Sequence, residues 1–127
     1  MNPADTKILV VDDIRTMRNV IKGILRNLGF TQLLDAEDGN QALGLLRSED
    51  LDLVICDWNM PKMNGLEVLE TMRSDSSLQG IPFIMVTAEN SKERITKAIE
   101  AGTDEYVVKP FNEDTMRTKI SNALKKR

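Results

Sequence analysis

The residue best placed to do chemistry in this sequence is Asp57, which directly follows an apolar run. Residues 51–56 are rich in β-branched and aliphatic side chains, as expected of a strand buried on both faces. Pro61 and Gly65 lie shortly after Asp57 and indicate a loop. Ligands bind at the carboxyl ends of the strands in open α/β sheets, so the sequence places a carboxylate where a ligand would be held.

Polar side chains end the other apolar runs in the same way. They are Asp12 and Asp13 after residues 7–11, Thr87 at the end of residues 82–87, and Lys109 after residues 105–108. The carboxyl ends of parallel strands share one edge of a sheet, so we expect these groups to meet Asp57 in one crevice. Three carboxylates held together repel one another, and a divalent cation relieves that repulsion. Oxygen ligands without histidine favour Mg²⁺.

Lys109 and Thr87 add a cation and a hydroxyl to the same crevice. This pairing suits a tetrahedral anion such as a phosphoryl group, and Asp57 could attack its phosphorus to form an acyl phosphate. Each residue alone has an ordinary explanation, because Asp and Thr after a strand commonly cap helices and a lone Lys is commonly a surface residue. These explanations weaken together, since each would have to apply independently at a different strand end.

Composition restricts the chemistry further. The chain has 127 residues, 41% hydrophobic and 29% charged, which is typical of an ordinary globule, and we expect one domain over residues 1–127. It contains no histidine, which excludes Ser-His-Asp hydrolases, His-ligated zinc sites and histidine phosphocarriers. The net charge of −3 does not favour binding to nucleic acid or to an anionic membrane.

Three further features predict a cytoplasmic location. The single cysteine, Cys56, lies within an apolar run and is interpreted as an inert buried thiol in a reducing compartment. No apolar run approaches the roughly 18 residues that a membrane-spanning helix needs. The first seven residues, MNPADTK, lack the apolar core of a signal peptide.

Apolar periodicity predicts five strands that alternate with five helices. We expect the strands at residues 7–11, 31–36, 51–56, 82–87 and 105–108, with a helix after each. The second helix, residues 39–47, should bury Ala42, Leu45 and Leu46, and Asn90 or Ser91 should cap the fourth. This alternation is typical of an α/β fold whose parallel sheet is covered by helices on both faces.

Five short motifs give the sequence a family resemblance. They are Val10-Val11-Asp12-Asp13, Asp57-Trp58-Asn59-Met60-Pro61, Met63 with Gly65, Val86-Thr87-Ala88-Glu89 and Tyr106-Val107-Val108-Lys109-Pro110-Phe111. In this order, and over essentially the whole chain, they resemble the receiver domains of two-component response regulators, above all the stand-alone chemotaxis regulators of the CheY type. The resemblance implies a flavodoxin-like, doubly wound five-stranded parallel sheet in the order 2-1-3-4-5 with five helices.

The resemblance also implies roles for the residues of the crevice. Asp57 would accept a phosphoryl group from the phosphohistidine of a chemotaxis-type sensor histidine kinase. Mg²⁺ would be held by Asp13, Asp57 and the backbone carbonyl of Asn59, with Asp12 in the same acidic pocket. Lys109 would contact the phosphoryl group, and the peptide bond that follows Lys109 would be cis.

The same resemblance implies a switch and an output face. Thr87 would hydrogen-bond a phosphoryl oxygen, and its movement would let the Tyr106 ring swing inward. The face built from the fourth helix, fifth strand and fifth helix would then bind the flagellar motor switch protein. The output residues implied are Lys92, Ile95, Ile99, Tyr106, Val108, Phe111 and Lys119. Trp58, the only tryptophan, should report metal binding by its fluorescence.

This output face departs from the chemotaxis type at several positions. That type favours a second lysine where Ser91 stands and small residues where Ile99, Thr103 and Glu105 stand. Here Ile99 adds bulk and Glu105 adds negative charge. The motor-binding surface is therefore expected in an altered form.

Two alternatives keep part of this chemistry. In one, the same receiver is a phosphate sink or regulates another protein through the same face. In the other, an aspartate-nucleophile phosphatase hydrolyses small phosphate esters, but that class separates its two aspartates by one residue, whereas Asp12 and Asp13 are adjacent. We expect a protein that assists its own phosphorylation and autodephosphorylation and turns over no separate substrate. We also expect it to be a monomer, and a dedicated phosphatase is a possible partner.

Overall fold

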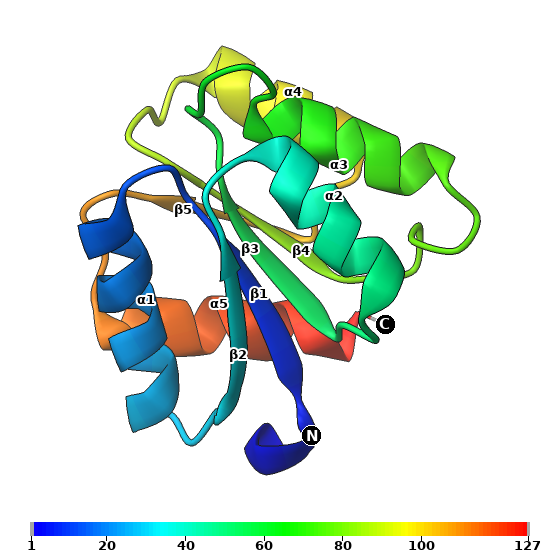
Figure 1. The fold of residues 1–127 in the computed structure, drawn as a ribbon. Coiled ribbons are helices and arrows are strands. Elements are labelled where there is room, and N and C mark those ends of the chain that lie inside the picture. The colour runs from blue at the N-terminus through cyan, green and yellow to red at the C-terminus, as the bar shows by residue number, and fades with distance from the viewer. Residues whose placement is uncertain (1, 127) are drawn as a thin grey trace.

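The computed structural model describes residues 2–126, in which strands and helices alternate along the chain (Figure 1). The strands are β1 (Lys7–Val11), β2 (Gln32–Ala36), β3 (Leu53–Asp57), β4 (Phe83–Thr87) and β5 (Glu105–Val108). The helices are α1 (Arg15–Asn27), α2 (Gly39–Ser48), α3 (Gly65–Ser74), α4 (Lys92–Ala101) and α5 (Glu113–Lys125). A short 3-10 turn, Pro3–Asp5, precedes β1. All predicted strands and helices are present, with their ends shifted by a residue or two.

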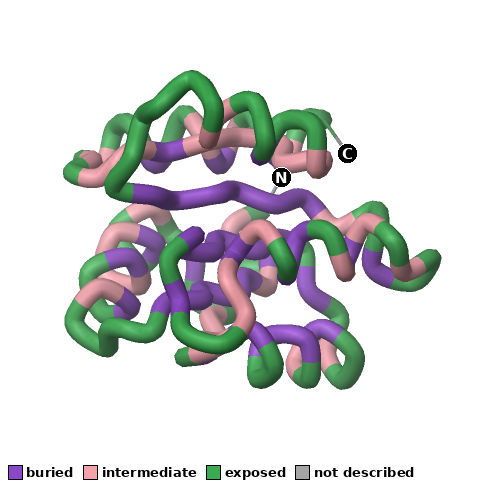
Figure 2. Tube along the Cα trace, turned by 90° about the horizontal axis from the view of Figure 1, so that it is seen from above, coloured by how far each residue is buried: buried purple, intermediate pink, exposed green. Residues whose placement is uncertain are grey.

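The sheet has the strand order β2-β1-β3-β4-β5, and every neighbouring pair is parallel. This confirms the flavodoxin-like, doubly wound fold. The chain first runs from β1 outward to the edge strand β2 and then returns past β1 to β3, so the order reverses between β1 and β3. Right-handed crossovers in the two directions place helices on both faces. In Figure 2 the buried segments lie in the middle of the molecule and the exposed turns of the helices lie outside.

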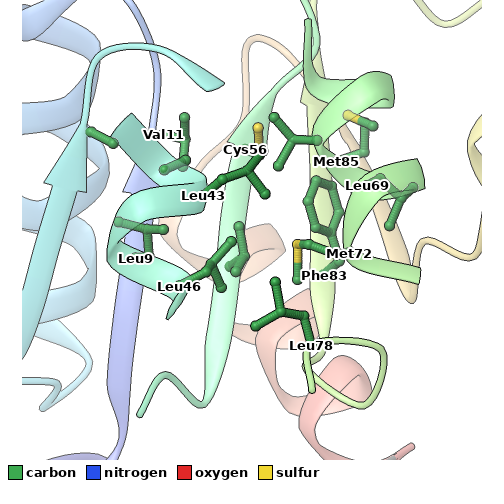
Figure 3. Packing of buried hydrophobic residues seen from close by; sticks show 14 of the residues in the cluster. Leu9, Val11, Leu43, Leu46, Cys56, Leu69, Met72, Leu78, Phe83 and Met85 are labelled. Atoms are coloured by element: carbon green, nitrogen blue, oxygen red, sulfur yellow. The ribbon is translucent and has the colours of Figure 1, made fainter. Parts of the chain in front are cut away.

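Each face of the sheet carries its own hydrophobic core, because side chains alternate along a strand. On β1, Ile8 and Val10 pack with residues of α1 and α5, whereas Leu9 and Val11 pack with residues of α2 and α3. Figure 3 shows the second cluster, which includes Leu43, Leu46, Cys56, Leu69, Met72, Leu78, Phe83 and Met85. Among the described helices, none is long and apolar enough to cross a membrane.

Helix α2 buries a set of residues that differs from the predicted one. Ala42 and Leu46 are buried as predicted, but Leu43 is buried in place of Leu45, which is only half-buried. Gly39, Ala42, Leu43 and Leu46 form one buried stripe of the helix, beside which Leu45 lies, and a Cβ atom at Gly39 would lie 2.8 Å from the Met63 side chain. Gly39 therefore faces inward, and the buried stripe continues from it at helical spacing.

The ends of α3 and α4 follow ordinary capping chemistry. Ser91 caps α4 by accepting a 3.2 Å hydrogen bond from the Arg94 N–H, which decides between the two predicted caps. Gly102 ends the same helix in a left-handed conformation with φ of 100°. At α3, Asn64 and Glu67 form a reciprocal capping box. These caps fix where α3 and α4 begin, and both helices begin beside the carboxyl edge of the sheet.

Candidate functional site

The three aspartates predicted to share a crevice come together. Asp12 and Asp13 follow β1 and Asp57 ends β3, and these strands are neighbours in the sheet. One carboxylate oxygen of each residue lies within 4.8 Å of those of the other two. Asp12 and Asp57 are buried, whereas Asp13 is exposed. The strand order reverses between these two strands, which is where doubly wound sheets bind ligands.

Lys109 supplies a counter-charge to this acidic crevice. Its Nζ lies 3.1 Å from Asp57 Oδ1 and 3.4 Å from Asp12 Oδ2. The side chain comes from the loop after the edge strand β5, and the Lys109–Pro110 peptide bond is cis as the resemblance implied. One ammonium group facing three carboxylates leaves the crevice negatively charged, which favours binding of a further cation.

The crevice changes the acid–base behaviour of Asp57. Burial raises the pKa of its carboxyl from 3.8 to about 6; Lys109 opposes this rise, and Asp12 and Asp13 add to it. Burial acts to lower the pKa of Lys109, but Asp57 and Asp12 outweigh it and the pKa is raised. Lys109 is therefore protonated at neutral pH, and the ionised form of Asp57 is held against an electrostatic cost.

The donor atoms of the crevice fit a hard divalent cation. The three converging groups are all carboxylate oxygens, and the chain has no histidine. The Cys56 thiol is buried, and burial raises its pKa well above the usual value, so it is a neutral thiol and no soft ligand. The site offers few protein oxygens, and Asp13 is exposed to solvent. Both features suit Mg²⁺, because this ion usually binds few protein ligands and retains several waters.

The loop after Asp57 is held close behind it by Gly65. The Gly65 N–H donates a 2.9 Å hydrogen bond to the Trp58 carbonyl. A Cβ atom on Gly65 would overlap the main-chain carbonyl oxygen of Asp57 and would lie 2.9 Å from the Trp58 Cα atom. Only glycine permits so close an approach of α3 to the end of β3. Gly65 therefore sets the position of the loop that carries Trp58 and Asn59.

Thr87 and Tyr106, the two residues expected to form a switch, both contact Glu89. The Thr87 side chain is buried, and its Oγ1 accepts a 3.2 Å hydrogen bond from the Glu89 N–H. The Tyr106 hydroxyl donates a 2.7 Å hydrogen bond to the Glu89 carbonyl oxygen. Burial raises the pKa of Tyr106, and the nearby Thr87 hydroxyl opposes the rise. The main chain of Glu89 thus connects Thr87, at the end of β4, to Tyr106 on β5.

Comparison with known proteins assigns this architecture. Residues 8–121 match the response regulator receiver domain. The chain belongs to the response regulator receiver family. It is 45% identical over 120 residues to the chemotaxis protein CheY of Pseudomonas aeruginosa, covering 94% of this chain and 97% of that protein. It is 43% identical over 120 residues to the chemotaxis protein CheY-3 of Vibrio cholerae, covering 94% of this chain and 92% of that protein.

Solved structures of other receivers have the same fold. The chemotaxis protein CheY4 of Vibrio cholerae superposes with a TM-score of 0.87 at 32% identity, covering 94% of this chain and 98% of that chain. The signal receiver domain of a histidine kinase from Syntrophus aciditrophicus gives a TM-score of 0.86 at 26% identity, covering 95% and 91% of the two chains. The same fold therefore occurs both in a chemotaxis protein and in the receiver domain of a histidine kinase.

Arg18 contacts the main chain of Asp12 in the receiver pocket, and the sequence analysis did not predict this contact. Although it is a charged residue it is buried on α1, where one guanidinium nitrogen donates a 2.7 Å hydrogen bond to the Asp12 carbonyl oxygen. Its Nε lies 2.8 Å from a carboxylate oxygen of Asp35 on β2. The sequence did carry a signal, because Arg18 shares the helix face of the buried Ile21 and Leu25. A charged residue on an apolar face requires buried partners.

Arg94 is the second contact residue that the sequence did not predict. Its guanidinium group lies over the Trp58 ring, 4.5 Å from the ring centroid, and donates a 3.2 Å hydrogen bond to the Asn59 side-chain oxygen. Its Nε lies 3.3 Å from Glu89 Oε2. Nothing in the sequence indicated this, because Trp58 and Asn59 are distant in the chain and Arg94 lies in an amphipathic helix that offers many surface positions.

The residues of the expected output face lie on α4, β5, the loop after β5, and α5. Ile99 is the most exposed large apolar side chain, at 61% of its full accessible surface. Tyr106 packs with the core beneath α2 and α3, whereas Phe111 packs with the core beneath α1 and α5. The negative charge that Glu105 adds to this face is paired, because its carboxylate lies 3.0 Å from Lys126 and 3.6 Å from Lys119. The remaining residues of the set are Lys92, which is exposed, and Ile95 and Val108, which are half-buried.

Proposed function

We propose that this protein is a phosphorylation-activated response regulator of a two-component chemotaxis pathway. The observation that carries the proposal is the convergence of three aspartates and Lys109 at the carboxyl edge of a receiver fold. Relatives at 43% and 45% identity are named chemotaxis proteins, which supports the choice of pathway. The proposed phosphoryl donor is a sensor histidine kinase of the chemotaxis type.

Asp57 is the proposed phosphoacceptor. One of its carboxylate oxygens attacks the phosphorus of the phosphohistidine; the P–N bond breaks, a P–O bond forms, and the imidazole leaves with the electron pair. Lys109 already lies 3.1 Å from Asp57 and would stabilise negative charge on the phosphoryl oxygens. The Thr87 hydroxyl accepts a hydrogen bond from Glu89, so its own hydrogen can be donated to a phosphoryl oxygen.

A divalent cation would complete this pocket. Asp12, Asp13, Asp57 and the backbone carbonyl of Asn59 are the groups that would hold Mg²⁺. When bound, Mg²⁺ would offset the repulsion between these carboxylates and the phosphoryl oxygens. The proposal rests on the oxygen-only donor set and the convergence of the three carboxylates.

Phosphorylation would reach the output face through Thr87, Glu89 and Tyr106. Donation of the Thr87 hydroxyl to the phosphoryl group would pull on Glu89, which is hydrogen-bonded to both Thr87 and Tyr106. The face formed by α4, β5 and α5 would then bind the flagellar motor switch protein. A local change in charge thereby biases a surface with two states.

The protein is proposed to act as a signalling module and not as an enzyme with a separate substrate. It would assist its own phosphorylation and the hydrolysis of its own acyl phosphate, which sets the duration of the signal. A dedicated phosphatase could shorten that duration. We propose that it works as a cytoplasmic monomer.

The decisive experiment uses beryllofluoride, which stands in for the phosphoryl group on Asp57. Binding of the N-terminal peptide of the motor switch protein is measured with and without beryllofluoride and Mg²⁺, while Trp58 fluorescence reports that the pocket has filled. Tight peptide binding only in the presence of both reagents supports the proposal. Asp57→Asn is the control, and it should abolish the fluorescence response to beryllofluoride. A wild-type protein that neither responds to beryllofluoride nor takes up phosphoryl contradicts the proposal.

A second candidate keeps the same phosphoacceptor but has a different output, either a phosphate sink or the regulation of another protein. The observation that favours it is the engagement of Lys119 by Glu105, because this lysine would otherwise be available to an acidic partner. The strongly exposed Ile99 also enlarges the face beyond what the chemotaxis type favours. A Trp58 response to beryllofluoride without binding of the motor peptide would support this second candidate.

A further inference from the structure

Arg94 makes three contacts that together join the two loops bordering the acidic pocket. Its guanidinium group lies 4.5 Å from the centroid of the Trp58 ring and within hydrogen-bond distance of the Asn59 side chain at 3.2 Å. Both residues belong to the loop that directly follows Asp57. Its third partner is the Glu89 carboxylate at 3.3 Å, in the loop that follows Thr87. Arg94 therefore connects the β3–α3 loop to the β4–α4 loop.

These contacts are stronger candidates for a function than an ordinary surface ion pair. The Arg94 side chain is only 26% exposed, because the Trp58 ring and the two loops cover it. Three simultaneous partners hold the guanidinium group in one orientation, so pairing with Glu89 costs little further side-chain entropy. By contrast, the Lys97 and Glu93 side chains on the same helix are 55% and 78% exposed, against 26% and 55% for Arg94 and Glu89. An isolated pair of that kind contributes little.

Neutralisation of Glu89 matters because of the charge that already surrounds the pocket. Asp12 and Asp57 both pair with the single ammonium group of Lys109, and Asp13 adds a third carboxylate to the cluster. The Glu89 carboxylate lies against Arg94, which also contacts Asn59 in the loop after Asp57, so an unpaired Glu89 would place a further negative charge near the loops that border the pocket. Clefts lined by one sign of charge repel ligands of that sign and lower their rate of association. A phosphoryl donor is such a ligand, since its phosphoryl oxygens are anionic.

We propose that Arg94 is a positioning residue that pairs with Glu89 and Asn59 and thereby favours reaction of the pocket with small anionic phosphoryl donors. The inference rests on the proposed function of Asp57. With acetyl phosphate as the donor, a carboxylate oxygen of Asp57 forms a bond to phosphorus, the bond from phosphorus to the bridging oxygen breaks, and acetate leaves with the electron pair. No proton or further reactant is needed for this step.

The experiment measures phosphorylation of the full chain by acetyl phosphate at saturating Mg²⁺, with incorporation followed by intact mass. Arg94→Gln is expected to lower the second-order rate constant about three- to tenfold at low salt. Adding Glu89→Gln to that variant should restore the rate to within about twofold of the wild type, because the unpaired charge is then gone. The deficit of Arg94→Gln should shrink when the ionic strength rises from about 0.02 to about 0.5 M.

A change in donor charge gives a readout that a purely structural role would not produce. Phosphoramidate carries less negative charge than acetyl phosphate at neutral pH, so Arg94→Gln should slow its reaction less. Lys97→Gln is the matched control, because it removes one positive charge from the same helix at an exposed pair. It should react like the wild type with both donors.

The outcomes separate failure of this inference from failure of the proposed function. If wild-type protein incorporates no phosphoryl group from either donor, the proposed function of Asp57 fails. If wild-type protein reacts and Arg94→Gln reacts equally fast, the inference about Arg94 fails while the proposed function stands. An Arg94→Gln deficit that Glu89→Gln does not restore, and that salt does not reduce, would also overturn the inference, since it would indicate only a displaced loop.

Discussion

The Tyr106 hydroxyl donates a 2.7 Å hydrogen bond to the main-chain carbonyl oxygen of Glu89. The N–H of the same Glu89 donates to Thr87 Oγ1 at 3.2 Å. One residue of the β4–α4 loop therefore contacts both the buried hydroxyl at the end of β4 and the aromatic side chain on β5. Thr87 and Tyr106 are therefore joined by a hydrogen-bonded path through this loop.

Tyr106→Phe removes this hydrogen bond and leaves the ring in place. Loss of one hydrogen bond to a half-buried tyrosine should lower the free energy of unfolding by about 0.5–1 kcal/mol. The main effect should be local, because the Glu89 carbonyl loses its partner. We expect faster amide hydrogen exchange in residues 88–92 with little change in β1 or β3. Equal exchange in the two proteins would show that the hydrogen bond does not order the loop.

The raised pKa of Asp57 predicts that Mg²⁺ affinity depends on pH in a mildly acidic range. Protons compete with the metal for the carboxylate, whose pKa is about 6 in the metal-free pocket. We expect the association constant, followed by Trp58 fluorescence, to be nearly constant above about pH 7 and to fall up to tenfold per pH unit below about pH 6. A constant affinity down to about pH 5 would contradict the raised pKa.

The same carboxyl predicts that Asp57→Asn stabilises the metal-free protein at neutral pH. The pKa of Asp57 is about 6 in the folded protein and 3.8 ordinarily, so folding favours the protonated carboxyl. The contribution of Asp57 to stability is therefore fully present below about pH 4 and is lost as the pH rises through about 6. Removing the charge should raise the free energy of unfolding by about 1–2 kcal/mol at neutral pH, after allowance for solvent screening. Urea unfolding of both proteins checks the difference, which should vanish near pH 4.

Asp38→Asn is the matched control for that comparison. Asp38 is half-buried and caps α2 through a 2.7 Å hydrogen bond from the Gln41 N–H, and Asn caps helices about as well as Asp. This substitution should change the free energy of unfolding by less than about 0.5 kcal/mol. A stabilisation equal to that of Asp57→Asn would show that the effect is a general loss of negative charge and not a property of the pocket.

Much of the fold could be predicted because its signals are local. Alternating apolar runs and helical periodicity located the strands and helices, and polar residues at the strand ends identified Asp12, Asp57, Thr87 and Lys109 before any contact was known. Strand order and the cis bond after Lys109 came from the family resemblance and not from the pattern.

The features that could not be predicted depend on contacts between distant parts of the chain. On α2, Leu43 is buried in place of Leu45 because the stripe shared by Ala42, Leu43 and Leu46 packs into the core, and the sequence pattern of the helix alone does not show which stripe that is. Glu105 on β5 pairs with Lys119 of α5 and with Lys126 directly after that helix, and the sequence did not predict either ion pair. Both features need the positions of neighbouring elements, which local sequence does not provide.

Gly65→Ala should lower both the stability of the protein and its affinity for Mg²⁺, although alanine has a higher helix propensity than glycine. The added methyl group would overlap the Asp57 carbonyl oxygen, so the end of β3 and the start of α3 must separate. We expect the free energy of unfolding to fall by about 1–3 kcal/mol, and Mg²⁺ binding to weaken because the loop carrying Asn59 is displaced. Urea unfolding and Trp58 fluorescence titration measure the two effects.

Gly44→Ala provides the comparison, since a Cβ atom there meets nothing within 4 Å and the residue is exposed in the interior of α2. Alanine has the higher helix propensity, so this variant should gain about 0.5–1 kcal/mol and bind Mg²⁺ as the wild type does. If the free energy of unfolding falls in Gly65→Ala and rises in Gly44→Ala, the difference comes from the surroundings of the two glycines, because the substitution is the same. Wild-type Mg²⁺ affinity in Gly65→Ala would show that the close approach of α3 to Asp57 does not position the metal ligands.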